Sequence, residues 1–250
     1  MKNKGILVIL FWLAVWQTIY IIIGNDVLFA SPMDTAKALC SLLSDSGFYK
    51  TVVCSFFRIA VGFLAGTVLG MLLGVATGLC HSAYLLLKPA IDLIKAAPVA
   101  SFIILALAWL KTGMVPIFIA SLTVVPVVWS NITEGIASVD YRLLEMAKVY
   151  EFSNQQKIET IYLPSVMPYF RSAAVTGAGF AFKSGVAAEV IGSPAFSIGR
   201  RLYESKIYLD TDELFAWTAV IIIISVLFER AVIKIFERSS YEADKYNKSL

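Results

Sequence analysis

Charged and chemically reactive side chains are scarce in this 250-residue chain. Only 16% of its residues are charged, and it contains one histidine and three cysteines. Cys40, Cys54 and Cys80 form no CxxC pair and are odd in number, so they indicate neither a disulfide framework nor a metal site. The net charge of +3 is too small to favour nucleic acid binding. An intramembrane enzyme would need clusters of His, Asp or Cys within its apolar segments, and the sequence has none.

Long apolar runs dominate the remainder of the sequence. Hydrophobic residues make up 58% of the chain and the mean hydropathy is +0.76, more than a soluble domain of this size needs. A helix that rises about 1.5 Å per residue needs roughly 20 apolar residues to cross the hydrocarbon layer. We therefore predict an all-α, multi-pass membrane protein with one domain over residues 1–250. The six predicted spans are residues 6–23, 56–80, 92–110, 114–133, 165–190 and 213–233.

The distribution of lysine and arginine predicts how the chain is oriented. Cytoplasmic loops of membrane proteins are enriched in both residues. With the N-terminus inside, twelve of them fall in cytoplasmic segments and six in outer segments. We therefore expect both termini in the cytoplasm, outer loops over residues 24–50 and 191–212, and a cytoplasmic loop over 134–163. Ser31-Pro32, followed by an amphipathic stretch, predicts a short helix in the first outer loop.

The second predicted span carries a glycine at every fourth position. Four residues turn a helix by about 400°, so these glycines form a slowly drifting stripe on one face. Small residues let membrane helices approach closely. We predict a helix-packing role for the stripe, either within one subunit or at a contact that slides or dimerises. Its members are Gly62, Gly66, Gly70, Gly74 and Gly78.

Two charged residues, Lys183 and Glu189, lie near the outer end of the fifth predicted span. A charged lysine is costly in lipid, so Lys183 should face a cavity, a partner or the membrane surface. It could attract an anionic substrate in a translocation pathway, or it could snorkel to the interface or pair with Glu189. Glu189 is expected mainly to order the loop that follows. Arg58, at the outer edge of the second span, is expected to anchor at lipid headgroups.

The polar segment from Glu145 to Pro164 interrupts this apolar sequence. The apolar residues at its start have helical spacing, which predicts an amphipathic helix that could dock in a groove of a cytoplasmic partner. In that interpretation the small side chain of Ala147 permits close approach. The candidate docking residues are Leu144, Glu145, Ala147, Lys148, Tyr150, Glu151, Leu163 and Pro164.

The spacing in this segment resembles the "EAA" loop of permease subunits from ATP-binding-cassette (ABC) importers. That pattern is Glu-Ala-Ala, a Gly four residues after the last Ala, and Ile-x-Leu-Pro about nine residues further on. Glu145, Ala147 and Ile161-Tyr162-Leu163-Pro164 stand in register with it. Met146 replaces the first Ala and Glu151 replaces the Gly, so we expect the turn slightly later, at Ser153 and Asn154.

Other segments extend the resemblance to the nitrate, sulfonate and taurine branch of that family, among them Pro89 to Pro98 and Ala187 to Gly192. The resemblance implies a type I importer permease fold in the cell membrane, carrying a small solute delivered by an extracytoplasmic binding protein. It implies two ATPase subunits docked on the 134–163 loop, a second permease copy and membrane lipid as further partners.

The same resemblance implies a subunit without catalytic activity of its own. The sequence has no GxxxxGK[ST] phosphate loop, so ATP and Mg²⁺ are expected on the partner ATPases, and no cofactor or metal on this chain. The alternative is a self-contained secondary transporter or channel. Such proteins usually show repeated halves, broken helices or paired charges at the membrane midplane, and none is evident here.

Overall fold

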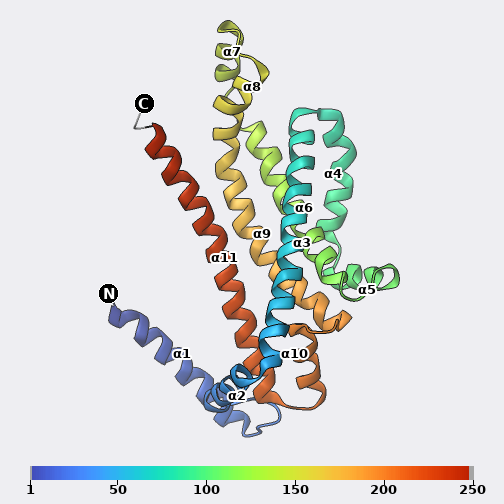
Figure 1. Ribbon diagram of the computed structural model, residues 1–250, viewed down its shortest axis with the longest axis vertical. Helices are drawn as coiled ribbons and strands as arrows, with labels where there is room; N and C mark the ends of the chain where they lie inside the picture. Colours follow the sequence, from blue (N-terminus) through green and yellow to red (C-terminus); the bar gives the residue numbers. More distant parts are fainter. Residues whose placement is uncertain (1, 248–250) are drawn as a thin grey trace.

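The computed structural model describes the backbone of residues 2–247 and the side chains of residues 6–236. Within these residues the chain forms helices joined by loops, without β-strands. Figure 1 shows a bundle built on four long helices. They are α3 (Ser46–Leu79), α6 (Val115–Ala137), α9 (Leu163–Gly192) and α11 (Thr211–Asn247).

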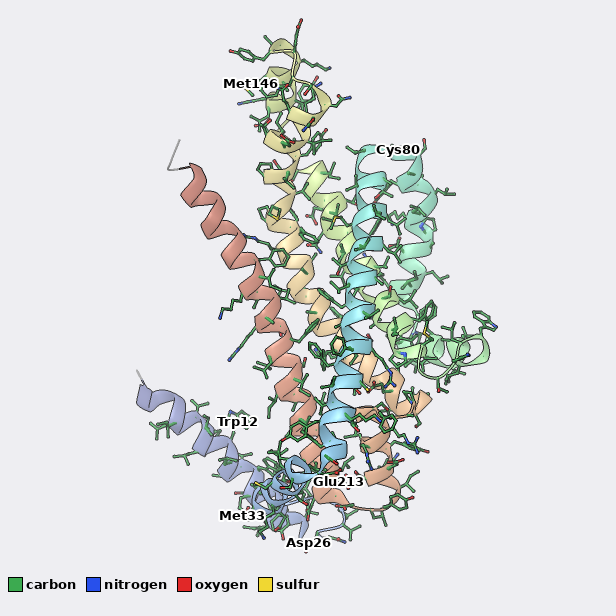
Figure 2. All side chains as sticks on the ribbon, viewed as in Figure 1. Trp12, Asp26, Met33, Cys80, Met146 and Glu213 are labelled. Carbon is green, nitrogen blue, oxygen red and sulfur yellow. The ribbon has the colours of Figure 1, made fainter. Side chains whose placement is uncertain are left out.

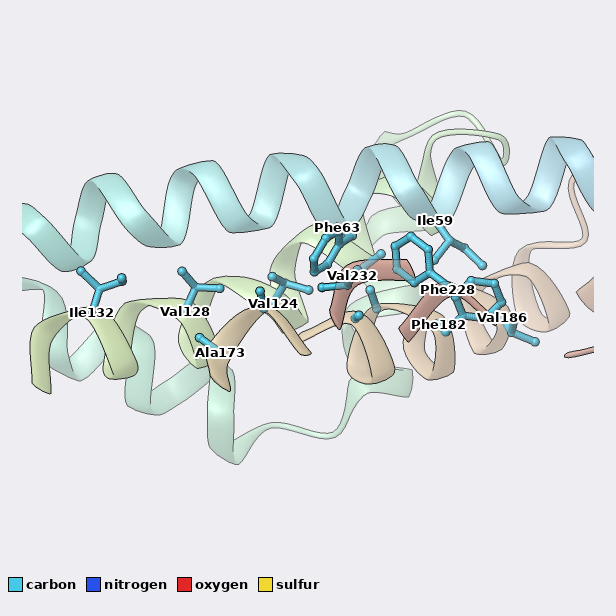
Figure 3. Close-up of a cluster of buried hydrophobic side chains, with 14 residues drawn as sticks. Ile59, Phe63, Val124, Val128, Ile132, Ala173, Phe182, Val186, Phe228 and Val232 are labelled. Atoms are coloured by element: carbon cyan, nitrogen blue, oxygen red, sulfur yellow. The ribbon is translucent and has the colours of Figure 1, made fainter. Parts of the chain in front are cut away.

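The main hydrophobic core lies where α3, α6 and α9 meet. Ile59 and Phe63 from α3 pack with Val124 from α6 and Phe182 from α9 (Figure 3). Phe228 of α11 joins the same cluster, and its ring meets that of Phe63 edge-on at 5.3 Å. The three central helices therefore bury side chains against one another, while their remaining faces are left for lipid or for partners.

All five glycines of the stripe face α6. A Cβ atom added to Gly62 would lie 2.5 Å from the carbonyl oxygen of Ile117, and one added to Gly70 would lie 2.8 Å from Cβ of Val128. Only hydrogen fits in that space, so α3 and α6 approach almost backbone to backbone. The stripe thus packs within the subunit and is not exposed as a sliding or dimer surface.

The third predicted span, residues 92–110, is not one straight helix. α4 (His81–Ala96) and α5 (Val99–Trp109) are separate helices inclined by 104°. Ala97 is extended, with ψ 141°, because the residue before a proline avoids the helical conformation. Pro98 also lacks the N–H that a continuing helix needs. The prediction of a single helix here is wrong, since it passed over the break at Pro98.

Helix boundaries differ elsewhere from the predicted spans. α3 begins at Ser46, ten residues before the predicted start at 56, because the Asp45 side chain caps it by accepting from the Gly47 N–H. By length and composition, four helices of the described chain could cross a membrane, or five if α4 and α5 make one span. The remaining predicted span, 213–233, lies within α11. The count of six and the cytoplasmic termini remain predictions.

Several short helices lie at the two ends of the bundle (Figure 1). α2 (Pro32–Ser44) and α10 (Ile198–Ile207) lie at one end, together with the last turns of α1 (Lys2–Ile23). α2 begins at Pro32, where the Ser31 hydroxyl accepts from the Asp34 N–H, so the expected short helix is present. α7 (Tyr141–Val149) and α8 (Asn154–Lys157) form the opposite tip, and the π-helical turn η1 (Ile158–Tyr162) joins them to α9.

Candidate functional sites

The tip formed by α7 and α8 projects beyond the other helices, as the labels of Met146 and Cys80 show in Figure 2. The Asp140 side chain begins α7 by accepting from the Arg142 N–H. Glu145 and Lys148 lie exposed on α7. Val149, the last residue of α7, and Tyr150, which follows it, are 79% and 70% exposed. The tip therefore carries uncovered apolar surface beside charged side chains.

The interior of the tip holds Ala147, which is 0% exposed. Leu144, three residues earlier on the same face, is half-buried. Ala147 therefore packs inside the chain, and the interpretation that its small side chain lets a partner approach is wrong. Leu163 and Pro164, at the start of α9, are exposed.

The turn after α7 is made at Glu151, where the resembled family pattern has glycine. Glu151 has φ 53°, a left-handed conformation that usually selects glycine at this position. Its N–H donates to the Lys148 carbonyl at 3.1 Å, and the Phe152 N–H donates to the Ala147 carbonyl at 2.8 Å, as in a Schellman cap. We expected the turn later, at Ser153 and Asn154. Ser153 instead caps α8 in a capping box with Gln156.

A buried carboxylate, Glu189, ties together the end of the bundle at which α10 lies. It is 0% exposed, and its Oε2 accepts from the Ser55 hydroxyl at 2.8 Å and from the Gly199 N–H at 3.2 Å. Ser55 in turn accepts from the Ile198 N–H at 2.8 Å. Glu189 thus joins α3, α9 and α10, which agrees with its expected role in ordering the loop that follows it.

The counter-ion of Glu189 is Arg58, with 3.5 Å between Arg58 Nη1 and Glu189 Oε1. The same guanidinium donates to the carbonyls of Ala195 at 2.8 Å and Phe196 at 3.0 Å. Arg58 is therefore an internal tie between α3 and the loop before α10, so the headgroup-anchor prediction is wrong. Ser55 and Arg58 stand three residues apart, about one helical turn, and Arg58 is the one charged residue between Cys54 and Cys80. This spacing was the signal from which the tie could have been predicted.

Lys183 lies on the exposed side of α9 and makes no hydrogen bond or ion pair with the residues whose side chains are described. The hypothesis that it pairs with Glu189 is wrong, because Arg58 occupies that place. Ser172 and Thr176 are exposed at helical spacing from Lys183. This face of α9 is therefore polar within a segment that is otherwise apolar enough to cross a membrane.

Comparison with known families decides what this bundle is. Residues 66–239 match the family described as binding-protein-dependent transport system inner membrane component. The chain belongs to this family. It is a multi-pass inner-membrane permease of an ABC importer, a class that works with ATPase subunits and a substrate-binding protein.

Named relatives of this permease come from several bacteria. It is 26% identical over 248 residues to the aliphatic sulfonates transport permease protein SsuC of Bacillus subtilis (strain 168), covering 96% of this chain and 89% of that protein. It is 25% identical to the taurine transport system permease protein TauC of Escherichia coli (strain K12), and the match covers 87% of this chain and 81% of that protein. It is also 26% identical to the nitrate import permease protein NrtB of Synechocystis, and that match covers 72% of this chain and 68% of NrtB.

Solved structures agree on the fold of the permease. A chain of a bacterial ABC transporter that imports the acidic polysaccharide alginate superposes with a TM-score of 0.65 and 15% identity, covering 95% of this chain and 96% of that one. A chain of the methionine ABC transporter MetNI, in an inward-facing conformation, superposes with a TM-score of 0.58 and 15% identity. The match covers 77% of this chain and 94% of that one. The type I importer permease fold is therefore confirmed.

Proposed function

We propose that this permease passes a small anionic solute across the membrane as one half of a homodimer, driven by two ATPase subunits that dock on the α7–α8 tip. The names of its relatives support the solute class, since sulfonate, taurine and nitrate all carry an oxyanion group. The subunit itself is non-catalytic in this proposal. ATP and Mg²⁺ bind to the partner ATPases, and no cofactor binds to this chain.

The observation that carries the docking proposal is the uncovered apolar surface at the tip. The side chains of Tyr141, Val149 and Tyr150 are 66%, 79% and 70% exposed. Helix α7, which begins at Tyr141 and ends at Val149, stands at the far end of the molecule, beyond the ends of α3 and α4 (Figure 1). Exposed apolar patches rimmed by charge are typical of protein interfaces, where aromatic residues supply much of the affinity. Glu145, Lys148 and Glu151 would form the charged rim, with Leu163 and Pro164 at the base of the tip.

The polar face of α9 supports the second half of the proposal. A lysine exposed on a membrane helix needs water, a carboxylate or a partner around it. Lys183 shares its face with Ser172 and Thr176, so the face suits either the contact with a second permease copy or a water-filled pathway between the copies. Lys183 would attract an anion there, and Glu189 would act indirectly by holding the outer loop.

The docking proposal is tested by co-purification with the co-expressed ATPase subunit. Tyr150→Asp puts a charge into the proposed contact and should cost at least about 2 kcal/mol, a roughly 30-fold weaker association. Tyr208→Asp is the matched control, because Tyr208 is 79% exposed at the opposite end of the bundle. Thermal unfolding in detergent should be unchanged in both variants.

Equal retention of the ATPase by both tyrosine variants would contradict docking at the tip. Uptake by the permease alone in proteoliposomes, without ATPase or ATP, would instead favour a self-contained transporter.

A further inference from the structure

We propose that the outer end of this permease holds a binding site for a small oxyanion, with Arg200 and Arg201 as its ligands. The site is a cavity of about 230 Å³. Its walls are the loop over residues 195–197, the first two turns of α10 and Thr51 of α3. That volume is several times the roughly 30 Å³ that one water occupies in the liquid, so a sulfonate or phosphate group fits.

Positive charge is in excess around the cavity. Glu204 is its one acidic lining residue among those described, and it is shared by two arginines. Arg200 Nε lies 2.7 Å from one Glu204 oxygen and Arg201 Nη1 lies 3.7 Å from the other. One guanidinium charge is therefore left without a counter-ion, and both side chains are nearly half exposed.

A third cation stands at the edge of the same cavity. Lys50 Nζ lies 3.7 Å above the centre of the Phe196 ring, which is part of the cavity wall. The donor groups of two guanidinium planes suit the oxygens of a sulfonate, sulfate or phosphate, because such anions accept several N–H groups in a fork. The first turn of α10 adds its own positive dipole end, since Ser197 caps that helix beside the cavity.

The loop that forms one wall is held in an unusual conformation. Ser193 and Phe196 have φ values of 43° and 51°, left-handed conformations that are strained for residues other than glycine. Arg58 holds this loop through the carbonyls of Ala195 and Phe196. Gly199 lets α10 press against α9, since a Cβ there would lie 2.5 Å from Cβ of Glu189. The Arg58–Glu189 pair thus positions the wall, although neither residue lines the cavity.

The anion could be a free solute or the phosphate of a lipid headgroup, since both present the same oxygens. That the anion is cargo on its way inward rests on the proposed function. The presence of an oxyanion site does not.

Calorimetric titration of the purified permease with ethanesulfonate, in nanodiscs of phosphatidylcholine, tests the free-solute source. The wild type should bind, and Arg200→Gln and Arg201→Gln should each weaken binding at least tenfold. Lys206→Gln is the matched control, because Lys206 is an exposed cation in the last turn of α10 that does not line the cavity. Its affinity should equal that of the wild type.

Native mass spectrometry from nanodiscs containing phosphatidylglycerol tests the lipid source. If lipid fills the site, both arginine variants lose bound phosphatidylglycerol while ethanesulfonate gives no heat. The proposal is overturned if neither ethanesulfonate affinity nor lipid retention distinguishes the arginine variants from Lys206→Gln. These readouts are independent of the ATPase docking test, so a failure of one proposal is not a failure of the other.

Discussion

Replacing Gly66 with alanine should separate two long helices at the centre of the bundle. A Cβ at Gly66 would lie 2.6 Å from the carbonyl oxygen of Ser121 and 2.8 Å from Cβ of Val124. Ordinary van der Waals contact begins at 3.4 Å, so α3 and α6 must move apart by about 0.8 Å at this crossing. Because the nearest atom is a backbone carbonyl, no rotation of a side chain can relieve the contact.

The size of the effect follows from comparison with a glycine that has free space. A Cβ at Gly179 in α9 would meet nothing within 4 Å. Both alanine variants gain the same helix propensity, about 0.5–1 kcal/mol, so their difference isolates the steric cost. Overpacking typically costs about 1–3 kcal/mol. A difference of 2 kcal/mol corresponds to a Tm difference of roughly 4–8 °C in a chain of this size.

Thermal unfolding in detergent, followed by tryptophan fluorescence, measures that difference. Trp129 of α6 is 4% exposed and should report separation of α6. Gly78→Ala gives an intermediate case, because its three nearest atoms all belong to the Ile136 side chain. The expected order of Tm is Gly179→Ala above Gly78→Ala above Gly66→Ala. Equal Tm values for the Gly66 and Gly179 variants would refute the close backbone approach of α3 and α6.

Three further perturbations test other parts of the structure. Arg58→Leu leaves Glu189 buried without its counter-ion and should lower the unfolding free energy by about 3–5 kcal/mol; an unchanged Tm would contradict the buried tie. Glu151→Gly removes left-handed strain of about 1 kcal/mol and should slow trypsin cleavage after Lys148 roughly fivefold, whereas faster cleavage would speak against the strained turn. Burial is the largest cause that raises the pKa of Asp212, and the neighbouring carboxylates of Asp34, Asp210 and Asp26 raise it further. The folded state therefore holds that proton more tightly, and stability falls as pH rises through this pKa. Because this loss of stability begins just above the ordinary aspartate pKa of 3.8, Asp212→Asn should narrow the difference in Tm between pH 4 and pH 7. A wider difference would reverse the assigned sign.

The tip formed by α7 and α8 shows how much of a segment's structure a sequence pattern predicts. The apolar spacing around Leu144 predicted a helix, and α7 is that helix, because local periodicity is enough to define an amphipathic segment. Which residue of that face lies inside was decided by the folded tip, where Ala147 is 0% exposed. The left-handed turn at Glu151 could not be predicted from the sequence either, because glutamate is not a residue type that favours a left-handed conformation.

The sequence by itself determined that this protein lies in a membrane and which family it resembles. Apolar runs of membrane length require helices, and the glycine period requires a close helix neighbour, because both follow from spacing along one segment. Tertiary structure alone decided which helix that neighbour is, that Arg58 meets Glu189 across 131 positions of chain (189 − 58), and that Arg200 and Arg201 border one cavity. Such contacts depend on how helices far apart in sequence cross in space, and no local pattern records that crossing.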